Sequence, residues 1–260
     1  MENTIQVLDH GFVTLRNISG PTRRIGLEGL DGNDAMEAML DGGRPFDADD
    51  TDPANTARMS FNQTDSGRTR EQDLKLAEYL MKNKHTTPFE MIEVWLEMKM
   101  PIFVARQFVR HRTVSINEVS GRYVTLPAEW YIPALGDVVI QSKDKKQGGK
   151  PIDLNDPDQV RVAENYRGRL YANCCAAYNS YEQSIADGIA MEHARLDLHV
   201  NHYTHWIWKQ DLHNLMHFLS LRDHSHAQIE AQKYGKAVDQ LIRQVLPHSM
   251  ELYDKYRRMS

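Results

Sequence analysis

Cysteine is scarce in this chain, and no segment has the composition of a secretion signal or a membrane span. The two cysteines among 260 residues, Cys174 and Cys175, are adjacent. They exclude a disulfide framework and suit a reducing compartment. Residues 1–12 lack a basic region followed by an apolar run, and no apolar run approaches the length of a membrane-spanning helix. We therefore expect a soluble, cytoplasmic protein without a membrane partner.

The fingerprints of phosphate-binding loops and of serine hydrolases are also missing. The chain has no G-x-x-x-x-G-K-[ST] motif, no G-x-G-x-x-G after a strand and no G-x-S-x-G. The net charge of −5 argues against a nucleic-acid partner, because proteins that bind nucleic acids in general carry an excess of positive charge. Any site for an anion must therefore be local.

Hydrophobic periodicity and capping patterns predict both helices and strands. Apolar residues alternate with polar ones over 92–99, as in a strand with one buried face. Thr69 followed by Gln72 forms a capping box, and Thr87 with Pro88 repeats a helix-start pattern. The expected strands cover 12–18 and 92–99, and the expected helices cover 69–84, 101–112, 157–187, 211–221 and 227–245. These elements, without internal repeats or linkers, predict a single α/β or α+β domain over residues 1–260.

Two segments have the composition of loops. Residues 31–56 are rich in Gly, Asp and Pro and contain eight acidic residues and one arginine, which predicts an exposed acidic loop. Residues 136–157 are polar and are expected to form a hairpin or a mobile loop. We interpret both segments as insertions.

The densest group of polar residues is RHRTVSINEVSGRY, residues 110–123. On the helix expected before it, Gln107 and Arg110 share a face, and an arginine beside an amide suits the capture of a phosphate. Short hydrogen-bonding residues and a glycine follow, at Ser115, Asn117, Ser120 and Gly121. A basic surface helix with salt bridges would explain an arbitrary pair of arginines. Here the Ser, Asn and Gly residues beside the arginines favour a site for a small anionic molecule.

A second polar group lies on the helix expected over 211–221. Its members are Asp211, His213, Asn214 and His217, and Arg222 follows the end of the helix. His213 and His217 could chelate a metal, with His224 or His226 as a third ligand. However, the glutamate of an H-E-x-x-H motif is absent, and twelve histidines make such a spacing frequent by chance. We therefore expect no metal and favour hydrogen bonding to a nucleotide or flavin, although each histidine taken singly could be a packed core residue.

Several blocks of the chain occur in the order of a known enzyme family. The polar run contains Arg110-His111-Arg112, then Ser115, Asn117, Ser120 and Arg122-Tyr123. The other blocks are residues 57–61, 85–90, 101–107, 211–222 and 225–228. Together they span about residues 57–234 and resemble the flavin-dependent thymidylate synthases, the thymidylate synthase complementing protein family.

The resemblance implies an enzyme that methylates dUMP to dTMP. Such enzymes take the carbon from 5,10-methylenetetrahydrofolate and the reducing electrons from NADPH through bound FAD. The resemblance also implies a central mixed or antiparallel sheet flanked by helices, and a homotetramer with sites between subunits. The flavin carries the difficult chemistry in this family, which agrees with the absence of a nucleophilic cysteine in a Pro-Cys-His setting.

Individual roles follow from the same resemblance. Arg222 would be the catalytic residue, which contacts the uracil edge and stabilises the charge that develops on the ring. Gln107 and Arg110 would hold the phosphate of dUMP. The full set of dUMP contacts would be Gln107, Phe108, Val109, Arg110, Glu118, Val119, Ser120, Gly121, Arg122, Arg195 and Arg222. The FAD contacts would be His85, Thr87, Arg110, His111, Arg112, Asn117, Glu118, Asp211, Leu212, His213 and His217.

Several alternatives stay open on the sequence alone. Ser120 could be a nucleophile, but no general base adjoins it, so we interpret it as a hydrogen-bond donor to dUMP. A metal-dependent hydrolase that uses His213 and His217, or a non-enzymatic nucleotide-binding protein, would also account for parts of the pattern. Leu198-His199 stands where the family usually has Leu-Pro. The two insertions either decorate the surface or shape the entrance for folate and NADPH.

Overall fold

The computed structural model describes residues 3–21, 48–62, 67–141 and 149–258. Its larger sheet has the strand order β1 (Thr4–Val7), β2 (Gly11–Ser19), β3 (Glu93–Pro101), β7 (Tyr203–Asp211) and β4 (Ser115–Glu118). A smaller sheet pairs β5 (Val139–Gln141) with β6 (Gly149–Pro151). The helices are α2 (Asp52–Arg58), α3 (Arg70–Lys82), α4 (Thr87–Glu90), α5 (Ile102–Phe108), α6 (Pro157–Ala186), α7 (Met191–Ala194), α8 (Leu212–Arg222), α9 (Ile229–Arg243) and α10 (Pro247–Tyr256), with 3-10 turns η1 (Met59–Phe61), η2 (Leu135–Asp137) and η3 (Arg195–Asp197).

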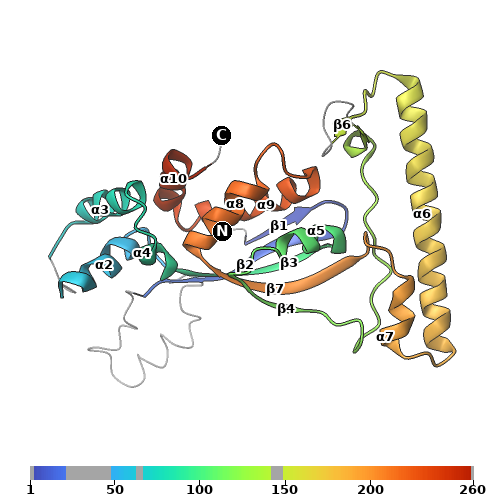
Figure 1. Cartoon of the computed structure of the whole chain (residues 1–260), viewed down its shortest axis with the longest axis horizontal. Helices are drawn as coiled ribbons and strands as arrows, with labels where there is room; N and C mark the ends of the chain where they lie inside the picture. Colours follow the sequence, from blue (N-terminus) through green and yellow to red (C-terminus); the bar gives the residue numbers. More distant parts are fainter. Residues whose placement is uncertain (1–2, 22–47, 63–66, 142–148, 259–260) are drawn as a thin grey trace.

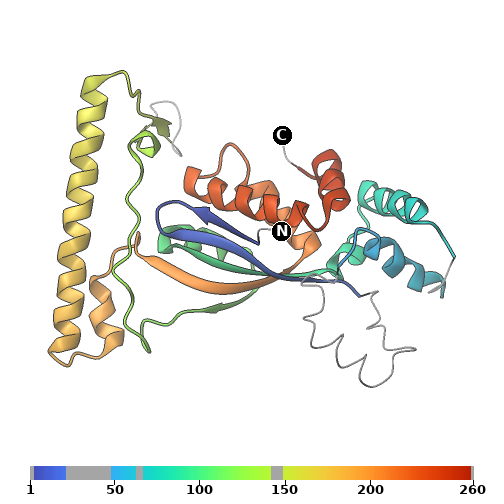
Figure 2. The ribbon, with the colours of Figure 1, turned by 180° about the vertical axis from the view of Figure 1, so that it is seen from behind.

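The sheet and its helices confirm the predicted α+β class. Every neighbouring pair of strands in the described part of the larger sheet is antiparallel. Helices α8 and α9 lie over the sheet, α9 packs against β1 and β2, and α8 packs against α9 and α4 (Figure 1). Helices α2, α3 and α4 gather near one end of the sheet and α6 stands beside the other end, as both views show (Figures 1 and 2).

Aromatic rings fill the core between the sheet and its covering helices. Phe108 on α5 and Phe218 on α8 are fully buried, and their rings meet edge to face with centroids 4.8 Å apart. Trp208 on β7 packs against the same two rings, at 6.0 and 5.2 Å. Edge-to-face contact is the favoured geometry for aromatic pairs. These contacts fix the position of α5 relative to α8, which matters below because the ends of both helices carry predicted site residues.

Strands β3 and β7 both alternate buried with partly exposed residues, but only β3 was predicted. The strand expected over 92–99 is confirmed, because one side of β3 is buried at Val94, Leu96, Met98 and Met100. Strand β7 has the same alternation, with Trp206 and Trp208 buried. It was not predicted, because its buried side also carries the polar residues Thr204 and Gln210. Those two residues interrupt the apolar period of two on which the prediction depends.

The two predicted helix starts near α3 and α4 had different outcomes. Thr69 caps α3 as expected: its hydroxyl accepts from the backbone N–H of Gln72, and the Gln72 side chain accepts from the backbone N–H of Thr69. The start predicted at Thr87 is wrong by one residue, because Thr86 occupies the N-cap position of α4 and makes no capping bond through its side chain. A start that depends on proline alone fixes the backbone angle but not the capping residue.

The helix predicted over 101–112 ends earlier than expected, as α5. In a longer helix the carbonyl oxygen of Gln107 would accept a hydrogen bond from the backbone N–H of His111. Instead it accepts from Nη2 of Arg222, at 2.9 Å. Arg110 therefore lies in the turn after α5 and does not share a helical face with Gln107, which corrects the geometry expected from their spacing.

The segment 31–56 is not simply an exposed acidic loop. Residues 31–47 lie outside the described residues, but Asp50 is only 2% exposed and α2 begins soon after it. The Asp50 carboxylate accepts hydrogen bonds from the backbone N–H groups of His248 and Ser249, at 3.0 and 2.8 Å. It thereby caps the positive end of α10, and this task explains why an acidic residue is buried there.

The segment 136–157 includes the hairpin that its composition predicts. Strands β5 and β6 pair antiparallel, and Gly149 lies opposite Gln141 in the register. The connecting residues 142–148 lie outside the described residues. The hairpin leads into α6, whose N-terminus is capped by Asp156.

Helix α6 is held to the rest of the chain by tyrosines. The hydroxyl of Tyr178 donates to the carbonyl oxygen of Leu126 at 2.9 Å, and the N–H of Leu126 donates to the hydroxyl of Tyr181 at 3.0 Å. Cys174 is buried on the same helix, as expected for a small core residue, and the exposed His199 lies with Nδ1 3.8 Å from its sulfur. Among the helices of the described ranges, none is long and apolar enough to cross a membrane.

Candidate functional site

The predicted catalytic arginine is anchored at the end of α8. Arg222 is the last residue of that helix, and its Nε donates to Nε2 of His111 at 3.0 Å. Its Nη2 donates to the carbonyl oxygen of Gln107 at 2.9 Å. Both acceptors belong to the end of α5 and the turn that follows. We call Gln107, His111 and Arg222 the arginine group.

The surroundings of His111 keep its ring uncharged. The side chain is 8% exposed, and the ring of Phe218 meets it edge to face at 5.0 Å. Burial, and next the positive charge of Arg222 and the neighbouring His217, lower the pKa of His111 from 6.5 to about 4. At neutral pH, Nε2 of the uncharged His111 ring can therefore accept a hydrogen bond from Nε–H of Arg222. An imidazolium could not, because it has no free acceptor nitrogen.

Two further contacts complete this end of the molecule. The side-chain Nε2 of Gln107 donates to Oε1 of Gln228 at 2.7 Å, so Gln228 fixes the orientation of the Gln107 amide. Arg110 and Arg112 are exposed in the turn after α5. Two accessible cations therefore flank the buried histidine of the arginine group in the sequence.

A pocket of about 340 Å³ lies near the other end of α5. It is lined by Ile102, Glu118, Val119, Ser120, Gly121, Leu126, Arg195, Leu198, Tyr203 and Thr204. Five of these are predicted dUMP contacts, and we call Glu118, Val119, Ser120, Gly121 and Arg195 the pocket group. Arg195 comes from a part of the chain more than 70 residues after the other members. The fold therefore brings distant predicted residues together around one cavity.

Backbone pairing and two close contacts shape the pocket group. The N–H of Val119 donates to the carbonyl oxygen of His205 at 2.8 Å, which continues the pairing of β4 with β7. The hydroxyl of Thr204 donates to the carboxylate of Glu118. A Cβ on Gly121 would lie 3.3 Å from Cδ of Arg195, so the absence of a side chain at this position lets the arginine approach the loop.

A third set of predicted residues lies around the start of α8. The carboxylate of Asp211 caps the helix by accepting from the backbone N–H of Asn214 at 2.8 Å. His213 is half-buried in the next turn, and burial, followed by the charge of Arg257, lowers its pKa. His85 and Thr87 are exposed beside and on α4, which packs against α8. These residues, predicted to contact FAD, thus come from neighbouring elements.

Known proteins match both the sequence and the fold of this chain. The family model described as thymidylate synthase complementing protein matches residues 46–248. A flavin-dependent thymidylate synthase of Treponema denticola is 34% identical in an alignment of 262 positions, which covers 99% of this chain and 84% of the relative. One of Ruegeria pomeroyi is 39% identical over 248 residues, which cover 92% and 80%. The crystal structure of the UMP/dUMP methylase PolB from Streptomyces cacaoi, bound with 5-Br dUMP, superposes with a TM-score of 0.73 at 26% identity, covering 98% of this chain and 100% of that one.

The chain belongs to the thymidylate synthase complementing protein family.

Family membership confirms the resemblance on which the site residues were assigned, and the structure shows how accessible those residues are. Most of them are exposed or half-buried, as residues that contact a ligand need to be. Four predicted residues are buried, namely Phe108, His111, Gly121 and Leu212, and the side chains of Phe108 and Leu212 lie fully within the core. Only the backbone of these two residues could reach a ligand. Asn117 is exposed on β4, and Arg122 lies beside the pocket group with Nε 3.4 Å from the carboxylate of Glu192.

Sequence reasoning missed four residues that support the site. Gln228 and Thr204 hold Gln107 and Glu118, as described above. Gln210 donates from Nε2 to the hydroxyl of Thr113 at 2.9 Å, which ties the turn before β4 to the end of β7. Arg257 lies close enough to His213 to influence its pKa. Gln228 could have been found, because it belongs to one of the blocks shared with the family, whereas the others are revealed only by the fold.

The metal site considered for the histidines of α8 gains no support. The described residues contain no group of three or more His, Cys, Asp and Glu side chains placed to hold a metal ion. His217 faces His111, with ring centroids 6.2 Å apart, and His224 stacks on His226 at 5.0 Å. His217, His224 and His226 therefore contact other histidine rings.

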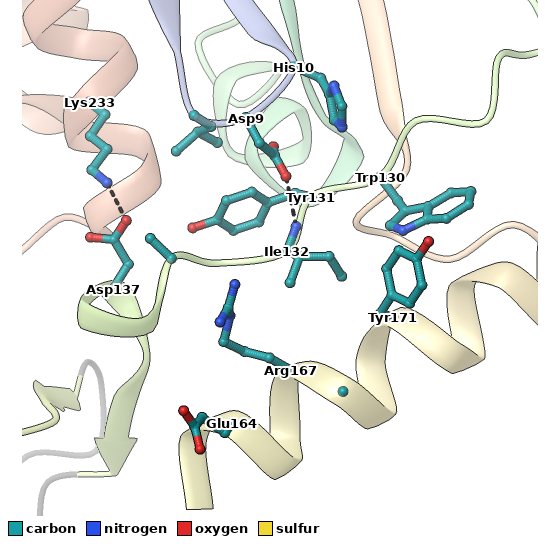
Figure 3. Close-up of a pocket in the computed structure, with 13 residues that line it drawn as sticks. Asp9, His10, Trp130, Tyr131, Ile132, Asp137, Glu164, Arg167, Tyr171 and Lys233 are labelled. Atoms are coloured by element: carbon teal, nitrogen blue, oxygen red, sulfur yellow. Dashed lines mark hydrogen bonds and ion pairs between the residues drawn. The ribbon is translucent and has the colours of Figure 1, made fainter. Parts of the chain in front are cut away.

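A second cavity, larger than the one beside the pocket group, contains none of the predicted site residues. It has a volume of about 900 Å³ and lies between α6, the 130–137 segment and the turn after β1 (Figure 3). Most of its charged side chains already have partners: Lys233 contacts Asp137 at 2.5 Å, and Nε of Arg167 donates to the carbonyl oxygen of Pro133 at 2.8 Å. This cavity is therefore a weaker candidate for the chemistry of the family than the arginine and pocket groups.

Proposed function

We propose that this protein is a flavin-dependent thymidylate synthase that methylates dUMP to dTMP. Its proposed cofactor is FAD, with 5,10-methylenetetrahydrofolate as carbon donor and NADPH as reductant. The observation that carries the proposal is the anchored guanidinium of Arg222, because it places a fixed cation beside the family's signature residues. The solved relative PolB, named as a UMP/dUMP methylase and bound with 5-Br dUMP, supports dUMP as substrate.

Arg222 supplies the electrostatic part of the reaction in this proposal. Its Nε and one N–H of Nη2 are committed to the protein, and the remaining N–H groups are available to a ligand. Directed at a carbonyl oxygen of the uracil ring, they would stabilise the negative charge that develops when the ring is activated. Because the guanidinium is held before substrate binds, little reorganisation is needed during the reaction.

The pocket group supplies the remaining contacts to dUMP. Arg195 offers a cation for the phosphate, and Ser120 offers a hydroxyl as donor. Glu118 is held by Thr204, so its carboxylate has a defined position as an acceptor. The cavity of about 340 Å³ is of a size for part of a nucleotide, which fits a substrate whose other end reaches the arginine group.

The residues around the start of α8 fit an anionic flavin nucleotide. Nε and Nη2 of Arg257 are shielded from solvent and have no hydrogen-bond partner among the described residues. N–H groups of a cation that are shielded from water without a partner are costly, so an anionic ligand would be bound favourably there. His213 near it, and the exposed Thr87 on α4, which packs against α8, offer hydrogen-bonding groups. When bound, FAD would pass the electrons of NADPH to the transferred carbon, and these residues would hold and orient it.

We further propose that a complete site combines residues from more than one copy of the chain. Gln107 of the arginine group and Ile102 of the pocket lining lie at opposite ends of α5. The two groups are therefore about 8 Å of helix rise apart along α5. A homotetramer with sites between subunits would bring the arginine group of one copy to the pocket group of another. Two cysteines without a disulfide support a cytoplasmic location.

The function is tested by supplying purified protein with FAD, dUMP, methylenetetrahydrofolate and NADPH. We expect dTMP to form and NADPH to be oxidised in a dUMP-dependent manner, and the purified protein to show the absorption bands of bound flavin. UMP should be offered in parallel, because PolB is named for both nucleotides. A colourless protein that binds no FAD and forms no dTMP would exclude the proposal.

A further inference from the structure

The hydrogen bond between Arg222 and His111 has a defined direction. Nε of arginine carries a proton and cannot accept, so Nε2 of His111 must be the acceptor over their 3.0 Å separation. The ring proton of a neutral His111 is then on Nδ1. The bond joins the end of α8 to the turn after α5, two elements whose positions are fixed by the Phe108–Phe218 contact.

His111 is held rigidly enough to fix another side chain. It is 8% exposed, its ring lies edge to face with Phe218 at 5.0 Å, and its backbone N–H donates to the carbonyl oxygen of Phe108 at 3.0 Å. Arg222, in contrast, is a long side chain with many rotamers, and a free guanidinium would lose much of that freedom on binding substrate. Because the rigid ring of His111 accepts a hydrogen bond from Nε, Arg222 gives up this rotamer freedom before the substrate binds.

We propose that His111 is a positioning residue that fixes the plane of the Arg222 guanidinium, so that its Nη edge faces the reacting nucleotide. This task is separate from the flavin contact that the family resemblance implies for His111. It rests on the proposed function, because Arg222 matters to catalysis only if the protein methylates a pyrimidine. The other anchor of Arg222 is the backbone oxygen of Gln107, so His111 is the anchor that a substitution can remove.

The tautomer of His111 tests the geometry without any activity. Nitrogen NMR of protein labelled in its histidine rings should show His111 neutral at pH 7, with the proton on Nδ1 and Nε2 in a hydrogen bond. The His111 signals are identified by their loss in H111F, or in H111Q if H111F does not fold. In R222A the Nε2 signal should move to that of a free acceptor. A proton on Nε2 in the wild-type protein, or an unchanged signal in R222A, would overturn the proposal.

A double-mutant cycle in the flavin-loaded enzyme tests whether His111 acts through Arg222. H111F should lower kcat for dTMP formation by roughly 10- to 100-fold with a smaller change in KM for dUMP. H111F/R222A should be no slower than R222A alone, because the residue that His111 positions is already absent. Multiplied losses in the double variant would overturn the proposal. H111L replaces H111F in the cycle if H111F does not fold, because leucine, like phenylalanine, offers Arg222 no acceptor.

Two controls, the variant H10F and the wild-type enzyme, distinguish the ways in which the proposal could fail. His10 also meets an aromatic ring edge on, that of Tyr203 at 5.7 Å, but it lies in the turn between β1 and β2. H10F should therefore keep wild-type kcat, and an equal loss in H10F would overturn a specific role for His111. If the wild-type enzyme forms no dTMP, the proposed function fails, while the tautomer still decides whether His111 fixes Arg222.

Discussion

The arginine group and the pocket group differ in how far their contacts are completed within one chain. In the arginine group, Arg222 has two protein acceptors and its partner His111 is buried. In the pocket group, Arg195 and Glu118 are exposed around an open cavity. The difference indicates that the first group is organised before ligand binds, whereas the second, under the proposed function, would acquire its remaining contacts from the nucleotide and another copy.

The largest effect is expected for Arg222. Replacing it by alanine should lower dTMP formation by about 1,000-fold, because a fixed cation that stabilises developing charge is removed. Bound flavin should be retained, since the residues predicted to contact it remain. The variant R161A is a suitable control, because Arg161 lies exposed on α6 in a pair with Asp158. Turnover near the wild-type value in R222A would remove Arg222 from the mechanism.

Acid should disrupt the buried arginine group through its histidine. The pKa of His111 is lowered from 6.5 to about 4, and burial also lowers that of His202 to about 4. The unfolded chain therefore binds protons more readily in this window, and the free energy of unfolding should fall as the pH drops from about 6.5 toward 4. The loss should be at most about 3 kcal/mol for each histidine.

Urea unfolding at several pH values between 7 and 4 measures this loss. H111F should show a shallower dependence than the wild-type protein, because one of the histidines with a lowered pKa is gone. Equal slopes for both proteins would show that His111 is not buried in its neutral form in solution.

Arg257 should affect the flavin more than the fold. Replacing it by methionine keeps the apolar stem and removes the unpaired cation, so flavin binding should weaken by about tenfold while the flavin-free protein keeps its Tm. The adjacent Arg258 pairs with Asp223 and Asp239 and provides a matched control. R258M should lower the Tm and leave flavin binding unchanged. Titration of FAD followed by fluorescence compares the two variants, and the reverse pattern would contradict the assignment.

The smallest effects are expected at Gly121 and Gly168, two glycines with different surroundings. A Cβ on Gly121 would lie 3.0 Å from Leu126 and 3.3 Å from Arg195, so G121A should raise KM for dUMP by about three- to tenfold. A Cβ on Gly168 in α6 would meet nothing within 4 Å. G168A should therefore stabilise the helix by about 0.5–1 kcal/mol and leave KM unchanged. Steady-state kinetics and thermal unfolding of both variants test the contrast.

Local patterns predicted local structure well. The capping box at Thr69 and the alternation in β3 depend on neighbours in the sequence, and both were confirmed. The end of α5 was predicted wrongly, because it is decided by a guanidinium that arrives from Arg222, more than 100 residues away. Strand β7 was missed for a related reason: its buried polar residues Thr204 and Gln210 find partners only in the folded chain.

The candidate site shows the same limit. The motif indicated which residues belong to it, but not that Gln107 and Arg222 form one group while Glu118 and Arg195 form another. Nor could the sequence show that the ring of His111 is the acceptor for Arg222. Such groupings depend on tertiary contacts between elements that are distant along the chain.

Mixing two inactive variants tests directly whether one site is assembled from the arginine group of one copy and the pocket group of another. R222A and R195A would be coexpressed with different affinity tags, and the mixed oligomers purified on both tags. If each site takes one group from each copy, about a quarter of the sites in randomly mixed oligomers contain both intact groups. We predict that dTMP formation returns to a corresponding fraction of the wild-type rate. Mixed oligomers as inactive as either variant alone would contradict it.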